Sequence, residues 1–97
     1  MYRFEVTNAK DMYHSNNRVH IPDCLFNAAS DLSLNLISIV GKSPVVEINK
    51  EGLEANKTVA ILNMKYGFKL KDVSEARLPI SVEIRNEVSR LLTEGKL

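Results

Sequence analysis

Two histidines and one cysteine are the side chains of this sequence with the widest chemical repertoire. His14, His20 and Cys24 form no Cys-x-x-Cys or His-Glu-x-x-His spacing, so no metal site is predicted. Cys24 has no His with Asp or Asn placed near it, and we expect a small buried residue there. Neither paired carboxylates nor a Ser-His-Asp order is evident. The sequence therefore predicts no catalytic activity of its own and no cofactor.

Two basic segments could contact phosphate groups. Gly41-Lys42-Ser43 ends like a phosphate-binding loop but lacks the upstream glycine. A second segment interleaves basic and aromatic residues, as RNA-binding strands do: Lys65, Tyr66, Phe68, Lys69 and Lys71. The aromatic residues are equally explained as core residues beside a helix end, with solvated lysines between them. A nucleic-acid-binding domain is therefore an alternative hypothesis and not the favoured one.

The length and composition are those of one small globular domain. A chain of 97 residues can bury a core without disulfides or a metal. Its 13 basic and 12 acidic residues nearly balance, which disfavours duplex DNA as a partner. The sequence has no signal peptide and no long apolar run, so we expect a cytoplasmic protein that does not enter a membrane.

Several elements follow from the spacing of apolar residues. Tyr2 to Thr7 and Val45 to Ile48 alternate as half-buried strands do, and Arg18 to Ile21 is a shorter candidate. Pro79 to Ile84 alternates as well and is predicted to be the last strand. A closing helix follows, capped by Asn86, with Val88, Leu91 and Leu92 buried and Gly95 at its end.

The segment from Pro22 to Lys42 supports two interpretations. Apolar residues at helical spacing favour a helix over Ala28 to Val40. The β-branched residues near its end favour a short helix followed by a strand from Leu34 to Val40. We favour the single helix and keep the second interpretation open.

The most informative stretch is Asn49 to Phe68. Lys50-Glu51-Gly52 is predicted to be a tight turn, which pairs Val45 to Ile48 with a short strand at Leu53 to Ala55. Thr58 would then cap a helix that runs to Tyr66, before Gly67. Together the elements predict an α+β fold: a two-layer open-faced sandwich, with an antiparallel sheet of about four strands and about three helices on one face.

This order of elements resembles the HPr family, the small histidine phosphocarriers of the sugar phosphotransferase system. The resemblance lies in Val45 to Phe68: strand, glycine turn, short strand, then Asn-Lys-Thr opening a helix that a glycine follows. It implies a single HPr-like domain over residues 1–97. It also implies a regulatory phosphorylation site at Thr58, where phosphate would meet the free N–H groups of a helix start.

The family's phosphorylated histidine lies in a His-x-Arg-Pro motif, to which His20-Ile21-Pro22-Asp23 corresponds only in part. The arginine that would stabilise the phosphoryl group is missing, and Asp23 places a negative charge there. The favoured hypothesis is therefore a regulatory or binding module without efficient phosphocarrier activity. It would bind protein partners through Val59 and Leu62, and a homodimer is compatible with it. The alternatives are a phosphocarrier that uses His20 and a nucleic-acid-binding domain that uses Lys65, Lys69 and Lys71.

Overall fold

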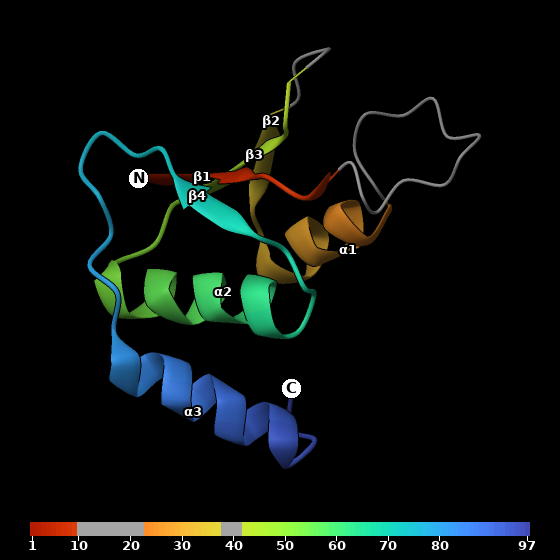
Figure 1. The fold of residues 1–97 in the computed structure, drawn as a ribbon, viewed down its shortest axis with the longest axis vertical. Helices are drawn as coiled ribbons and strands as arrows, with labels where there is room; N and C mark the ends of the chain where they lie inside the picture. The colour runs from red at the N-terminus through yellow and green to blue at the C-terminus, as the bar shows by residue number, and fades with distance from the viewer. Residues whose placement is uncertain (10–22, 38–41) are drawn as a thin grey trace.

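The computed structural model describes residues 1–9, 23–37 and 42–97. Within these ranges the order of elements is strand, helix, two strands, helix, strand, helix (Figure 1). The bounds are β1 (Tyr2–Val6), α1 (Asp23–Leu32), β2 (Asn35–Ile37), β3 (Val45–Ile48), α2 (Gly52–Met64), β4 (Leu70–Asp72) and α3 (Val82–Thr93). None of the helices in these ranges is long and apolar enough to cross a membrane.

The four strands form one antiparallel sheet in the order β2-β3-β1-β4. Phe4 of β1 lies between Val46 of β3 and Asp72 of β4, which fixes the register across the two central strands and one edge. Strands β1 and β2 are thus parallel and separated by β3, and β3 and β4 are separated by β1. Two such split βαβ units, each with its helix, make up the ferredoxin-like arrangement.

The helices form two successive layers on one side of the sheet. Helices α1 and α2 cover the sheet, and α3 lies on the far side of α2 (Figure 1). One core fills the space between the sheet and the first two helices, with Phe4, Val46 and Leu62 among its fully buried members. A second, smaller core joins α2 to α3 through Ala60, Ile61 and Val88. The predicted α+β open-faced sandwich is therefore confirmed, with α3 packed on a helix.

The single helix predicted over Ala28 to Val40 is wrong, and the second interpretation is right for the described residues. Helix α1 ends at Leu32 because Ser33 adopts the left-handed conformation, with φ +56°. Its N–H bonds to Ser30 O and the N–H of Leu34 bonds to Ala29 O, the hydrogen bonds of a Schellman cap. The chain then enters β2. The predicted strand at Arg18 to Ile21 lies outside the described residues, as does the end of the predicted strand after Ile37.

The predicted hairpin at Gly52 is also wrong. Gly52 is the first residue of α2, and Leu53 to Ala55 belong to the helix. Strand β3 pairs with β1 and β2 instead. Helix α2 ends close to the predicted position, and Gly67 has φ +77°, the left-handed conformation that glycine adopts without strain.

The last two elements differ from their predictions as well. The segment after Phe68, for which no strand was predicted, contains β4, and Pro79 to Ile84 is not a strand, since Val82 already begins α3. Ser81, and not Asn86, caps α3, because its hydroxyl accepts a hydrogen bond from the N–H of Ile84 (3.3 Å). The closing helix itself is confirmed, with Val88 buried and Gly95 in the left-handed conformation just beyond its end.

Candidate functional site

Those residues singled out from the sequence that the structure describes do not come together in one exposed site. His20 lies outside the described residues. Thr58 is not a helix cap: it lies within α2, only 3% exposed, and its hydroxyl donates to Glu54 O (3.0 Å) and accepts from Lys50 Nζ (3.3 Å). The helix N-terminus that was expected to hold a phosphate begins at Gly52, almost two turns earlier.

The predicted partner surface is likewise corrected. Leu62 is completely buried in the core between the sheet and α2. Val59 is buried as well, so neither offers an exposed contact, although Val59 lines the cavity described below. Both belong to the core that α2 forms with the sheet. Cys24, predicted to be buried, is exposed on α1.

The basic-aromatic segment is used within the fold. Phe68 is fully buried, and its ring stacks on that of Tyr66 with centroids 6.1 Å apart. The Tyr66 hydroxyl donates to Asp31 (3.0 Å), and burial together with this carboxylate raises the tyrosine's pKa. Lys69 and Lys71 are exposed. The aromatic rings that would stack on bases therefore already have partners within the protein.

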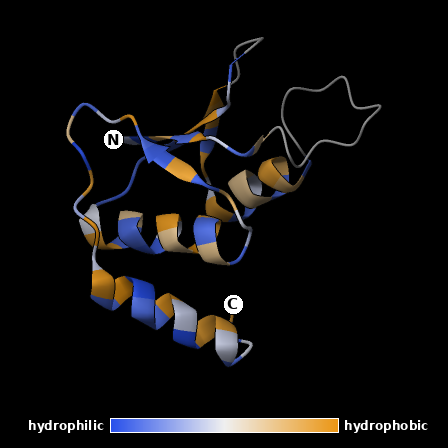
Figure 2. Cartoon of the chain, viewed as in Figure 1, coloured by the Kyte–Doolittle hydropathy of each residue, from blue (hydrophilic) through white to orange (hydrophobic). Residues whose placement is uncertain are grey.

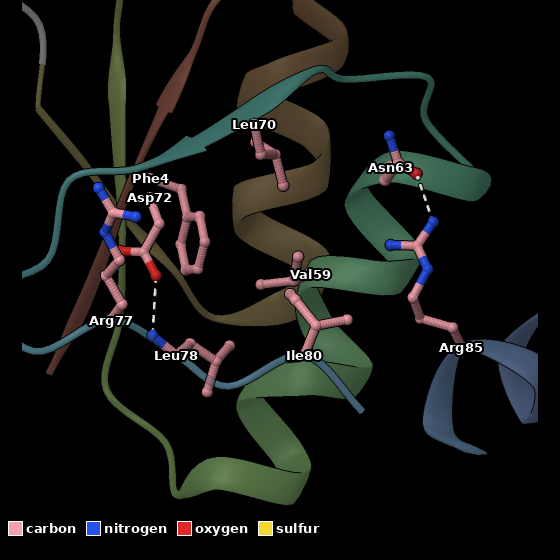
Figure 3. Close-up of a pocket in the computed structure, with 9 residues that line it drawn as sticks. All are labelled: Phe4, Val59, Asn63, Leu70, Asp72, Arg77, Leu78, Ile80 and Arg85. Atoms are coloured by element: carbon pink, nitrogen blue, oxygen red, sulfur yellow. Dashed lines mark hydrogen bonds between the residues drawn. The ribbon is translucent and has the colours of Figure 1, made fainter. Parts of the chain in front are cut away.

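A cavity of about 340 Å³ lies where β1, β4, α2 and the start of α3 meet (Figure 3). Its apolar walls come from Phe4, Val59, Leu70, Leu78 and Ile80, and its polar groups from Asn63, Asp72, Arg77 and Arg85. This volume is at the lower end of the range for small-molecule sites. Apolar walls with a few polar groups are also typical of such sites. Sequence reasoning missed it because β4 and the cap at Ser81 were not recognised.

Asp72 holds one wall of the cavity in place. Its carboxylate oxygens accept hydrogen bonds from the N–H groups of Ser74 (2.9 Å) and Leu78 (2.8 Å), which turn the segment after β4 back towards α3; Figure 3 shows the bond from Leu78. Burial by itself raises the pKa of Asp72. The hydrogen bonds from Ser74 and Leu78 and the charge of Arg77 outweigh burial, and the pKa lies below its ordinary value. This carboxylate is a structural clamp that remains ionised.

The opposite wall carries a cation with a neutral partner. Arg85 of α3 donates through Nη2 to Asn63 Oδ1 (3.3 Å), and the Asn63 amide in turn donates to Phe68 O (3.0 Å). Arg85 belongs to none of the ion pairs formed among the described residues. Arg77 lies on the other side of the cavity, beside Asp72 (Figure 3). The guanidinium of Arg85 is therefore available to an anion.

The described part of the lining suits the binding of a ligand. Among the residues that the structure describes, the lining holds no His, Cys, Ser or Lys, and its carboxylate, that of Asp72, already accepts hydrogen bonds from the backbone. Within the described ranges, no three His, Cys, Asp or Glu side chains come together as metal ligands would. The cavity can hold an apolar body and neutralise one negative charge.

Comparison with known proteins adds no family to this picture. No protein-family model matches the sequence, and neither a curated protein nor a solved structure matches the chain.

Proposed function

We propose that this domain is a binding module for an organic anion with an apolar body, held in the cavity between β4, α2 and α3. The observation that carries the proposal is the position of Arg85 at the wall of a largely apolar cavity, where its partner among the described residues is a neutral amide. A guanidinium binds a carboxylate or phosphate through paired, charge-assisted hydrogen bonds. The apolar walls would contribute the rest of the affinity through burial of the ligand's body.

The proposal keeps one element of the sequence-based hypothesis, namely a regulatory or binding module without chemistry of its own. It does not include phosphocarrier activity. The role implied for Thr58 required a helix start, and that residue is buried in mid-helix. Nucleic acid is not the proposed ligand either, because Phe68 is in the core.

The test is a titration of the protein with 4-phenylbutyrate. Binding is measured by calorimetry and by the changes in the amide NMR signals of Leu78 and Ile80. Two control ligands are used: 4-phenylbutanamide, which is neutral, and acetate, which has the carboxylate but lacks the large apolar body. We expect the phenylbutyrate to bind at least about tenfold more tightly than either control, since a hydrogen bond to a charged group contributes about 1.5–3 kcal/mol. Affinity should fall with added salt.

A matched pair of variants locates the anion. Arg85→Gln should weaken phenylbutyrate binding about tenfold. Arg90→Gln is the control on the same helix, because Arg90 pairs with Glu94 outside the cavity. Equal binding of the acid and the amide, or equal loss in the two variants, would reject the proposal.

A further inference from the structure

The apolar surface does not stop at the mouth of the cavity. Ile80, which lines the cavity, is 57% exposed, and two further apolar side chains near it are more exposed still: Val82 at 67% and Leu53 at 70%. We call Leu53, Ile80 and Val82 the apolar rim. A small acid that fills the cavity would leave most of this rim in water, and exposed apolar side chains that gather on neighbouring segments are a common feature of binding sites.

The buried amide of Asn56 holds the parts of the rim together. Its Nδ2 donates to Gly52 O (2.8 Å) and to Pro79 O (2.9 Å), and its Oδ1 accepts from the N–H of Ser81 (2.9 Å). The Asn56 amide therefore bridges the backbone on either side of Ile80 to the first turn of α2, where Leu53 lies. Figure 1 shows the starts of α2 and α3 at the same end of the molecule, and Figure 2 shows apolar residues at the start of α3.

The backbone at the rim has unused hydrogen-bonding groups. The N–H and C=O of Ile80 form no hydrogen bond with the described part of the chain. The next residue, Ser81, is extended, with φ −98° and ψ +110°. An exposed extended segment of this kind can pair with the backbone of another extended chain, with alternate side chains of that chain entering pockets.

We infer that the ligand is the C-terminal end of a peptide with a large apolar last residue, a conclusion that rests on the proposed function. The last side chain fills the cavity, and the terminal carboxylate meets Arg85. The preceding residues run past Ile80 as a short strand, so that an earlier apolar side chain covers Leu53 and Val82. A peptide uses the cavity, the cation, the backbone groups and the rim together, whereas an acyl chain leaves the backbone groups of Ile80 unused.

Binding of N-acetyl-valyl-seryl-valyl-phenylalanine tests this inference. It is compared with its C-terminal amide, with N-acetylphenylalanine and with decanoate, all on the full chain. We expect the peptide acid to bind at least about tenfold more tightly than each of the other three ligands. The amide lacks the terminal carboxylate, N-acetylphenylalanine lacks the residues that cover the apolar rim, and decanoate lacks the backbone groups that pair with Ile80.

Substitution at the rim separates the two proposals. Val82→Ser and Leu53→Ser should each weaken peptide binding about threefold to tenfold and leave N-acetylphenylalanine unchanged. Val73→Ser is the matched control, since Val73 is exposed but belongs neither to the cavity nor to the rim. If N-acetylphenylalanine binds as tightly as the peptide and the rim variants have no effect, the peptide inference fails while the proposed function stands. Tighter binding of decanoate would assign the rim to an acyl chain, and no binding by any acid would reject both proposals.

Discussion

Helix α2 meets two different environments on its opposite sides. Towards the sheet it contributes Val59 and Leu62 to a core that includes Phe4 and the fully buried branched side chains of the strands. Towards α3 it contributes Ala60 and Ile61 to a smaller core completed mostly by partly buried residues. Because both of these sides of α2 are apolar, both must be covered. The comparison shows that α3 is needed to cover α2, and that the cavity lies where the two sides meet.

Replacing neighbouring residues of α2 by alanine measures the difference between its two sides. Leu62 faces the sheet and Ile61 faces α3, and each substitution removes the same number of carbon atoms. We expect Leu62→Ala to lower the free energy of unfolding by about 4 kcal/mol and Ile61→Ala by about 2 kcal/mol, because the smaller core can collapse around the missing atoms. Urea denaturation provides the measurement. Equal losses would mean that α3 packs on α2 as rigidly as the sheet does.

Much of the fold could be predicted from the sequence where the spacing of apolar residues had one interpretation. The alternation in β1 and β3 placed those strands nearly correctly, and the glycines after α2 and α3 placed the ends of those two helices, though not their starts. The errors lie where one residue type serves two purposes. Thr58 looked like a cap, yet a threonine hydroxyl in mid-helix can donate to the carbonyl four residues earlier, as it does here.

The candidate site could not be predicted because it is formed by tertiary contacts between short segments. The sequence pattern of each of these segments is weak. Strand β4 has three residues, and its side chains take their roles from β1 beside it. Helix α1 ends because Ser33 adopts the left-handed conformation, which glycine usually occupies. A serine at this position therefore does not predict the end of the helix. One usable signal was overlooked: between Ala55 and Leu62 the only charged residue is Lys57, which indicates a helix enclosed by other elements.

Asn56 links α2 to the segment before α3, so its removal should loosen α3 selectively. Asn56→Ala leaves the Ser81 N–H and the Pro79 carbonyl without their partner. We expect a loss of about 2 kcal/mol of stability, since an unpaired buried polar group costs about 1–3 kcal/mol. Amide hydrogen exchange should accelerate in α3 more than in β1 and β3. Asn86→Ala, at an exposed position of α3, is the control and should change stability by less than about 0.5 kcal/mol. Uniform acceleration throughout the protein would contradict a selective link.

The smallest expected effect concerns the clamp on the sheet side of the cavity, and it depends on pH. Because the pKa of Asp72 is lowered in the folded protein, its ionised form contributes stability above the unfolded pKa, near 4, and this contribution is lost as the pH falls through the folded pKa. Asp72→Asn should therefore be less stable than the wild type at pH 7 by about 1 kcal/mol, a value reduced for the partial exposure of this side chain.

The difference between Asp72→Asn and the wild type should shrink as the pH falls below the unfolded pKa, in urea denaturation curves measured from about pH 7 to about pH 2. Glu87→Gln, on the exposed surface of α3, should differ from the wild type by less than about 0.5 kcal/mol at pH 7. A stability difference for Asp72→Asn that stays constant from pH 7 to pH 2 would mean that the shape of the side chain, and not its charge, holds Leu78. The segment over the cavity would then be fixed by packing alone, in the same way as the core on the sheet side of α2.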